Sequence, residues 1–320
     1  MTHPSHHVTR VLATVSDASA AARSRLAASW RRSIDRHGLD PARRDGVQRV
    51  EQTQLCERRQ RAEQLMRLAG PRLDALYQLV GSSGCGVLLT DAEGVVLDLR
   101  SSEGDRAIFD SWGLTPGADW SEASEGTNGI GTCLAERRHV IIHRDEHFHA
   151  RNTAMSCMDA PIYGAEGEIV AALDVSSARA DQTEGFNRLI AAMVAQTARQ
   201  IETDSFRASF PKARILVAET PETEAATLLA VDGDDIVIGA TRGARRAFGL
   251  SSTGPLAPVP TVDLLGREDG PTGFDKAERA AVMRALARAG GNVSEAARAL
   301  GVGRATLYRR MKRLGIDESR

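Results

Sequence analysis

The stretch Gly291-Asn292-Val293-Ser294-Glu295-Ala296-Ala297-Arg298-Ala299-Leu300-Gly301-Val302-Gly303-Arg304-Ala305-Thr306-Leu307-Tyr308-Arg309-Arg310-Met311 predicts two short helices joined by a glycine turn. Asn292 and Ser294 are good helix-starting residues, because their side-chain oxygens accept the unpaired N–H groups of a first turn. Gly301 can end that helix, since glycine tolerates the positive φ of a C-terminal cap. The second helix has inward-facing apolar residues at four- and three-residue steps, Leu307, Met311 and Leu314. Two helices in this arrangement form a helix-turn-helix, which places its second helix in the DNA major groove.

The charge distribution agrees with a DNA-binding tail. Residues 275–320 hold eleven Lys and Arg against five Asp and Glu, a net charge of +6. The whole chain has a formal charge of −1, so residues 1–274 carry −7. Contact with phosphates favours such an asymmetry. The charge alone would also suit a solvated basic helix in a small bundle, and only the turn pattern beside it favours DNA binding.

A further helix is expected over residues 275–289, with an inward stripe of Val282, Met283 and Leu286. Gly290-Gly291 ends it. Three helices in fewer than fifty residues bury little apolar surface, so this unit is expected to form a homodimer.

A wider pattern consists of Glu278, then Gly290-Gly291-Asn292, then Ser294-x-Ala296-Ala297-x-x-Leu300-Gly301, then Arg304-x-Thr306-Leu307-Tyr308-Arg309. This pattern resembles the Fis-type DNA-binding domain that ends many bacterial enhancer-binding activators. The resemblance implies a homodimeric four-helix unit that binds inverted half-sites in double-stranded DNA. It also implies DNA contacts by five residues, Asn292, Ser294, Arg304, Thr306 and Arg309.

The expected contacts differ in kind along the second helix. Arg304 falls in its first turn, where side chains reach base edges. Arg309, Arg310 and Lys312 are expected at phosphates, which set affinity and register without reading sequence. Tyr308 fits either core packing or a hydrogen bond to phosphate.

The composition indicates a folded chain of 320 residues with two or three domains. No stretch approaches the roughly 18 apolar residues that span a bilayer, and no secretory signal opens the chain. The cytoplasm is therefore the expected location. The four cysteines include no Cys-x-x-Cys pair and are expected to be small, mostly buried hydrophobes, Cys56, Cys85, Cys133 and Cys157.

The remaining sequence predicts an α+β fold. Residues 1–80 are expected to be mainly helical. Two apolar runs, 85–90 and 95–99, flank a glycine-containing turn and predict a hairpin. More strands are expected over 140–143, 155–163 and 169–175. Strands with segregated helices favour an antiparallel sensor-type sheet over a parallel Rossmann sheet.

A long helix is expected over residues 183–206, because apolar residues recur there at three- and four-residue steps. Its first half is expected to cover its own sheet. Its second half is expected to form a seam with a second copy of the chain.

The segment Glu125-Gly126-Thr127-Asn128-Gly129-Ile130-Gly131-Thr132 is followed by His147-Phe148, Cys157, Ala160-Pro161-Ile162 and Leu173-Asp174. Together these are similar to the GAF domain of acetoin-catabolism-type regulators. The earlier segments Ser29-Trp30-Arg32-Ser33 and Gly38-Leu39-Asp40-Pro41 look like the N-terminal helical region of that family. The resemblance implies a domain over residues 81–206 that senses a small molecule, with the glycine-rich segment as a scaffold turn beside its pocket.

The segment after this domain resembles the opening of a PAS domain over residues 207–250, but it is too short for a complete one. Residues 251–273, rich in Pro, Gly and Thr, are expected to be a linker. The Fis-type unit is expected over residues 274–320.

One departure from the resembled activators concerns ATP. Those proteins usually carry an ATPase between sensor and Fis-type domain, yet nothing here matches Gly-x-x-x-x-Gly-Lys-[Ser/Thr], and residues 207–273 are too few for such a domain. The chain is therefore expected to recruit, repress, bend DNA or pair with a full-length activator. RNA polymerase is a further candidate partner.

The candidate ligand-binding residues surround a histidine-rich segment. Imidazole plus thiolate would suit iron, zinc or haem, but the spacing His-x-x-x-His-x-His fits no standard site. A polar loop whose histidines are satisfied by hydrogen bonds is favoured, a histidine contact to an anionic or carbonyl ligand comes next, and no cofactor is predicted. The candidates are Trp112, Asn128, Thr132, His143, His147, His149, Cys157 and Asp159.

Other functional classes fit less well. The loop 126–131 lacks a lysine and the Gly-x-Gly-x-x-Gly spacing, which disfavours a phosphate site. A hydrolase would need Cys157 or Ser156 beside a histidine and Asp159, but neighbours on one strand alternate faces. We therefore expect no enzyme and no catalytic residues. The sequence predicts a bacterial transcription regulator, with a metal- or haem-based sensor or an architectural DNA-bending protein as alternatives.

Overall fold

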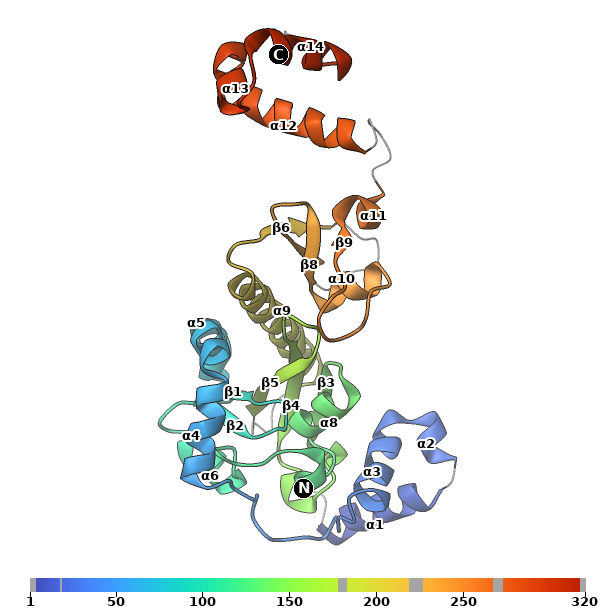
Figure 1. Ribbon diagram of the computed structural model, residues 1–320. Helices are drawn as coiled ribbons and strands as arrows, with labels where there is room; N and C mark the ends of the chain where they lie inside the picture. The colour runs from blue at the N-terminus through green and yellow to red at the C-terminus, as the bar shows by residue number, and fades with distance from the viewer. Residues whose placement is uncertain (1–3, 18, 178–182, 219–226, 267–272, 317–320) are drawn as a thin grey trace. The chain divides into compact units, whose positions relative to one another are not determined.

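The computed structural model describes residues 4–17, 19–177, 183–218, 227–266 and 273–316 (Figure 1). The chain divides after Thr261 into two compact units, Met1–Thr261 and Val262–Arg320. The fold is α+β, as predicted, with two antiparallel sheets and a helical C-terminal unit. Within the described residues, no helix has the length and apolar character needed to cross a membrane.

The chain begins with helices, as predicted: α1 (Pro4–Ser16), α2 (Ala20–Arg23), α3 (Arg25–Asp35), α4 (Gln52–Arg61) and α5 (Glu63–Val80). The Ser24 side chain accepts the backbone N–H of Ala27 and thereby starts α3. Trp30 of α3 is buried against Val11 and Phe148. Its indole N–H donates to the Glu146 carbonyl at 2.9 Å, so α3 is attached to a loop far along the chain.

The central sheet has five antiparallel strands in the order β2-β1-β5-β4-β3. Their bounds are β1 (Cys85–Thr90), β2 (Val96–Arg100), β3 (Val140–His143), β4 (Ser156–Tyr163) and β5 (Ile169–Ser177), with the short turn η1 (Gly81–Ser83) before β1. The predicted hairpin is confirmed, and Asp91 shapes its turn by accepting the N–H groups of Glu93 and Val95.

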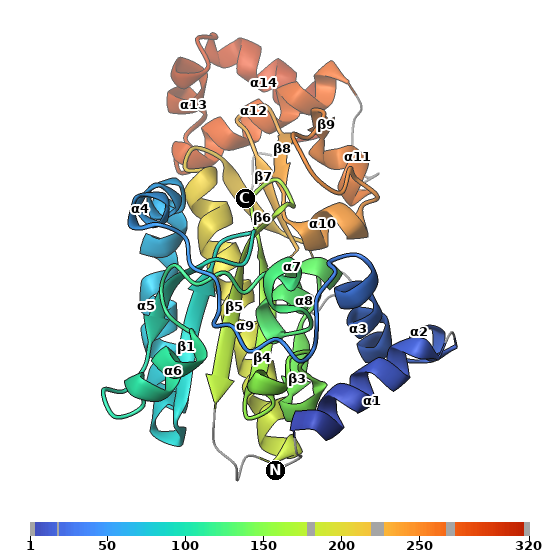
Figure 2. The same cartoon turned by 90° about the horizontal axis from the view of Figure 1, so that it is seen from below.

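The two faces of the central sheet carry different layers (Figure 2). Helices α5 and α9 (Glu184–Ser209) cover one face with an apolar core. The other face is covered by α6 (Arg106–Trp112) and α8 (Gly129–Glu136). The short helix α7 (Glu122–Glu125) precedes α8, and the turns η2 (Arg144–Glu146) and η3 (Ala150–Asn152) follow β3. Because side chains alternate along a strand, Met158 of β4 joins the first core and Cys157 the second.

The predicted dimer seam on the second half of α9 is wrong. Val194, Ala198 and Ile201 are buried in the same core as residues of α5. Phe206 is buried in the core of a second sheet. The chain therefore covers the apolar stripe itself, because α9 lies between other elements along most of its length.

The second sheet, called the small sheet below, has four antiparallel strands in the order β6-β7-β8-β9. They are β6 (Arg214–Val217), β7 (Leu228–Val231), β8 (Ile236–Ala240) and β9 (Val259–Pro260), with α10 (Arg242–Ala247) after β8. The segment predicted as a linker differs in its first part, because β9 pairs with β8. Buried Arg245 joins that segment to β8 by donating to the Ala240 carbonyl of β8 and to the Ser251 and Gly254 carbonyls of the segment.

The C-terminal unit contains α12 (Phe274–Arg288), α13 (Val293–Ala299) and α14 (Arg304–Arg313), preceded by α11 (Thr261–Leu265). The predicted stripe of α12 needs one correction: Val282 is buried, but Met283 is 44% exposed. Gly301 has a φ of +64°, as its predicted role as a helix end requires. The unit has one core, formed by all three helices.

Candidate functional site

The exposed face of α14 is the candidate DNA interface. Leu307 and Met311 are buried and mark the side of α14 that faces α12 and α13. Successive residues turn by about 100° along a helix, so Arg309 and Lys312 lie on the opposite, solvent-facing side. Both are exposed, and neither has an ion pair in the part of the chain that the structure describes.

Arg304 and Tyr308 lie one turn apart at the N-terminal end of α14. The Arg304 guanidinium carbon is 5.5 Å from the centroid of the Tyr308 ring, and its Nη2 is 3.4 Å from the Tyr308 hydroxyl. Arg304 is exposed, whereas Tyr308 is half-buried. The ring therefore supports the guanidinium and shares in the packing of the unit.

The first helix of the motif is set by its cap. The Asn292 side-chain oxygen accepts the N–H groups of Ser294 and Glu295 at 3.0 and 3.3 Å. This contact starts α13 and occupies the side-chain oxygen. Ser294 and Thr306 are both half-buried in the unit.

Arg310, predicted at a phosphate, has a partner within the chain. Its Nη1 lies 3.1 Å from Glu278 Oε1 of α12, and Arg313 contacts the same carboxylate. The structure thus divides the predicted phosphate ligands, all of them exposed, into Arg309 and Lys312, which have no ion pair among the described residues, and Arg310, which is ion-paired with α12.

A second candidate site lies between α8 and the central sheet and is called the buried polar cluster here. It consists of His147, Cys157, Asp159, Asp174 and Ser176, all buried. The Ser176 hydroxyl lies 3.1 Å from Cys157 Sγ and 2.8 Å from Asp174 Oδ2. Asp159 and Asp174 are directly opposite each other in the pairing of β4 with β5.

The two carboxyl groups of the cluster hold protons more strongly than usual. Burial raises the pKa of Asp174 to about 7, although the hydrogen bond from Ser176 opposes the change. Burial and the neighbouring Asp174 raise the pKa of Asp159 well above its usual range. Burial and the same carboxyls also raise the pKa of the Cys157 thiol, which is therefore neutral at neutral pH. At neutral pH the Cys157 thiol and the Asp159 carboxyl are therefore protonated, and Asp174 is the acidic group of the cluster that titrates near pH 7.

The three candidate histidines have separate environments. His147 Nδ1 lies 2.9 Å from the Arg144 carbonyl and Nε2 lies 3.4 Å from Cys157 Sγ, and burial lowers the His147 pKa to about 4. His143 Nδ1 contacts Ser156 Oγ at 2.7 Å and Asn187 at 3.0 Å.

His149 stacks edge-on against Phe148, with ring centroids 5.1 Å apart, and burial lowers its pKa to about 4. Among the described residues, no group of three or more His, Cys, Asp or Glu side chains has a metal-binding arrangement.

The start of α8 covers the cluster closely. Asn128 is the N-cap of α8, accepts the Gly131 N–H at 2.8 Å and donates to the Trp120 carbonyl at 3.1 Å. A Cβ atom on Gly129 would lie 2.0 Å from Asp159 Oδ2, so only glycine fits there. Thr132, predicted at the pocket, is buried, and its hydroxyl has no hydrogen-bond partner among the described residues.

Trp112 packs at the edge of the same layer and is half-buried, with its ring centroid 6.0 Å from that of Phe109.

Two residues of the buried polar cluster were not predicted as ligand-binding residues. The sequence pointed to Asp174 only as part of a motif and did not point to Ser176. No spacing rule links β4 to β5, and the only available signal was the polar pattern of an otherwise apolar strand.

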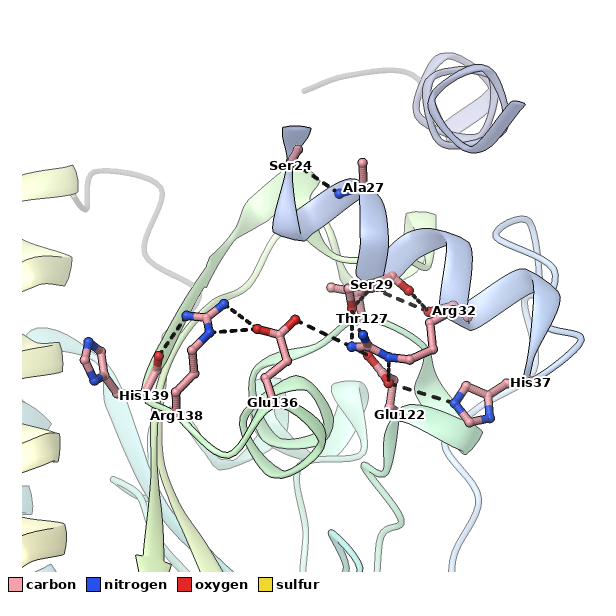
Figure 3. A network of polar contacts seen from close by, with 11 residues as sticks. Ser24, Ala27, Ser29, Arg32, His37, Glu122, Thr127, Glu136, Arg138 and His139 are labelled. Carbon is pink, nitrogen blue, oxygen red and sulfur yellow. Dashed lines mark hydrogen bonds and ion pairs between the residues drawn. The ribbon is translucent and has the colours of Figure 1, made fainter. Parts of the chain in front are cut away.

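A network of ion pairs joins α3 to the loop that precedes α8 (Figure 3). The Glu122 carboxylate accepts Arg32 Nε at 2.5 Å and the Ser29 hydroxyl at 2.8 Å. Ser29 also contacts the Thr127 hydroxyl at 2.7 Å, and Arg32 lies 3.6 Å from Glu136. The hydrogen bond to Glu122 raises the pKa of Arg32. The N-terminal helices therefore hold the loop that caps the buried polar cluster.

The same loop is held from its other side by Glu125. This carboxylate is fully buried, pairs with Arg151 and lies 3.4 Å from the Asn152 side chain. Burial raises the pKa of Glu125, while the Arg151 charge lowers it. The segment 121–128, which includes α7, is thus fixed at two carboxylates by separate parts of the chain.

Comparison with known proteins agrees with this architecture. Residues 64–203 match the model of the GAF domain, and residues 274–314 match that of the Fis family of bacterial regulatory proteins. Neither model is a catalytic domain. Both resemblances predicted from the sequence are confirmed, and the 204–273 segment between the matches leaves no room for a central ATPase.

Two curated relatives are transcriptional regulators. The chain is 32% identical over 243 residues to the acetoin catabolism regulatory protein of Cupriavidus necator, covering 75% of this chain and 36% of that protein. It is 30% identical over 156 residues to the acetoin dehydrogenase operon transcriptional activator AcoR of Bacillus subtilis, covering 48% and 25%. The chain therefore spans about a third of the first relative and a quarter of the second, to which it is distantly homologous.

A solved structure supports the fold. The Escherichia coli DhaR(N)–DhaL complex contains a chain that matches with a TM-score of 0.52 at 14% identity, covering 72% of this chain and 78% of that one. The present chain combines a GAF domain with a Fis-type helix-turn-helix, the domains of a DNA-binding transcriptional regulator.

Proposed function

We propose that this chain binds specific DNA as a homodimer and that a small molecule held at the buried polar cluster controls the binding. The observation that carries the proposal is the exposed cationic face of α14, with Arg309 and Lys312 opposite the buried Leu307. Asn292 caps the preceding helix and Gly301 ends it, so the motif has the geometry of a groove-binding unit.

The cluster supports ligand binding through its incomplete hydrogen bonding. Apart from Asp174, neither oxygen of Asp159 has a hydrogen-bond partner among the described residues, and the Thr132 hydroxyl has none. Buried polar groups are normally paired with protein, water or ligand. A small polar metabolite that offers hydroxyl or carbonyl groups would satisfy both side chains without bringing a charge into the core.

Helix α9 connects the end of β3 to the small sheet, which comes before the DNA-binding unit in the chain. Near its start, Asn187 contacts His143 at the end of β3. Near its end, Phe206 is buried beside Leu228 and Ala230 of the small sheet. A change at the end of β3 would therefore move one continuous helix that also forms part of the core of the small sheet.

Two exposed apolar side chains on α12 favour a homodimer. Phe274 is 95% exposed and Met283 is 44% exposed. Large apolar groups of this kind are commonly covered by a second subunit. A dimer would also present two copies of α14 to the two half-sites of an inverted repeat.

The relatives' names suggest a catabolic operon as the target and a small metabolite as the effector. Since no ATPase lies between the two matched regions, the chain would act by recruiting RNA polymerase, by blocking it, or by pairing with a full-length activator. In the DhaR(N)–DhaL complex the similar protein has a protein partner, and a comparable partner is a further possibility for this GAF domain.

The test is a gel-shift titration of the full chain on DNA from upstream of its own gene, repeated at rising salt. Saturable binding that exceeds binding to random DNA supports the proposal. Equal affinity for both DNAs would contradict specific recognition.

A thermal-shift screen of small hydroxy and carbonyl metabolites tests ligand binding at the buried polar cluster. The screen is run on the full parent chain and on Asp159→Asn, and an increase in Tm is expected for the parent chain alone.

A further inference from the structure

The cationic residues of α14 fall into two sets according to their partners. Arg310 Nη1 lies 3.1 Å from Glu278 Oε1. Arg313 donates to Glu278 Oε2 and lies 3.7 Å from Asp275 Oδ1. One carboxylate of α12 therefore receives two arginines that are a single turn apart on α14.

All four side chains are exposed, including 45% of Arg310 and 58% of Arg313, but only the first set is ion-paired with α12. Arg309 and Lys312 have no ion pair within the part of the chain that the structure describes. They lie on the side of α14 opposite the buried Leu307, whereas the first set is rotated toward α12. Arg309 and Lys312 can contact phosphate without breaking an ion pair, whereas Arg310 and Arg313 would first have to leave Glu278.

The neighbour of Glu278 adds a second attachment at the same place. Arg279 Nη1 donates to the Leu314 carbonyl at 2.7 Å and to the Gly315 carbonyl at 3.1 Å. These are the unpaired carbonyls that follow the last turn of α14. Two consecutive residues of α12 thus fix the C-terminal end of the recognition helix, one through side-chain charge and one through a cap.

We propose that Glu278 is a positioning residue that holds α14 against α12 and withholds Arg310 and Arg313 from DNA phosphate. The inference rests on the proposed DNA binding. Since phosphate contacts carry no sequence information, two additional arginines at the backbone would raise affinity for every duplex alike. Glu278 therefore limits non-specific binding and leaves a larger share of the binding free energy to base contacts.

The test measures the salt dependence of binding by the full chain and by Glu278→Gln, with fluorescence anisotropy on a labelled random-sequence duplex. Each phosphate contact changes the slope of log Kobs against log salt concentration by about 0.9 for B-form DNA. Release of both arginines should steepen the slope by up to about 1.8 for each bound copy of the chain and tighten binding at low salt. An unchanged slope would overturn the proposal.

Glu295→Gln is the matched control. Glu295 lies on α13 of the same unit, is exposed, and has no ion pair among the described residues. The substitution removes the same charge without releasing an arginine, so the slope should stay that of the parent chain. Equal steepening in both variants would show a general charge effect and would contradict a positioning role.

Arg310→Gln provides an independent measurement that does not depend on the folding of Glu278→Gln. In the otherwise unchanged chain it should leave the slope as it was, whereas Arg309→Gln should reduce it by about 0.9. A reduction of the slope by Arg310→Gln equal to that by Arg309→Gln would refute the inference.

The outcomes separate this inference from the proposed function. If the parent chain binds no duplex at low salt, both fail. If the parent chain binds DNA but Glu278→Gln has the same slope, only the inference fails.

Discussion

Replacing Arg32 by Met should detach α3 from the loop that caps the buried polar cluster. The Arg32 side chain is 26% exposed and the Glu122 side chain 5% exposed, so the change leaves a buried carboxylate without its cation. Removing one partner of a fully buried pair costs about 3–5 kcal/mol, and the partial exposure of Arg32 places the expected loss at roughly 2–3 kcal/mol. For a unit of this size that corresponds to a fall in Tm of about 4–12 °C.

The assay is thermal unfolding of the full chain, followed by circular dichroism at neutral pH. Adding Glu122→Gln to Arg32→Met should recover much of the loss, because a neutral amide needs no cation and still accepts the Ser29 hydroxyl. Arg188→Met is the matched control: its pair with Glu184 is exposed on both sides and should contribute at most about 0.5 kcal/mol. The reasoning is refuted if Arg32→Met melts with the control, or if the double variant is no more stable than Arg32→Met.

Three other outcomes are expected. Gly129→Ala should abolish effector-induced stabilisation and cost about 1–3 kcal/mol, because its Cβ would overlap the Asp159 carboxylate; a thermal-shift titration that matches the parent chain would exclude this crowding. Burial raises the pKa of Asp174 to about 7, so between about pH 4 and pH 7 the folded state holds a proton that the unfolded state has lost, and stability falls over this range and then levels off. Asp174→Asn should therefore gain stability relative to the parent chain as pH increases from 5 to 8 in urea titrations, and a pH-independent difference would contradict the raised pKa. Arg304→Ala should reduce specific binding by about 1–3 kcal/mol, whereas Lys312→Ala should weaken binding to all duplexes alike; equal losses on operator and random DNA for Arg304→Ala would disprove its base contact.

The predictions from sequence succeeded where one local pattern decides one element. Asn292 and Gly301 act where capping chemistry placed them, because a cap depends on neighbours within a turn. The hairpin around Asp91 was predictable for the same reason. The prediction for Met283 is wrong because its helical spacing fits the buried stripe, whereas the core formed with α13 and α14 includes Val282 and leaves Met283 44% exposed.

The sequence could not show which polar residues meet across strands and helices. Asp159 and Asp174 come together through the register of β4 with β5, which no motif spacing encodes. Arg32 and Glu122 are ninety residues apart in the chain, and only the docking of α3 pairs them. The stripe on α9 likewise has the period of a dimer seam, and only the presence of α5 and the small sheet shows that this chain covers it.

The amino-acid order alone was enough to recognise both domain types and the groove-binding motif, because helix caps, glycine turns and apolar periodicity act over a few residues. Tertiary structure alone decided which cations of α14 are available to phosphate, which carboxyls share the buried polar cluster, and how the N-terminal helices hold its cap. Those properties depend on side chains brought together by the packing of distant segments, and the same side chain is free or paired according to what lies against it.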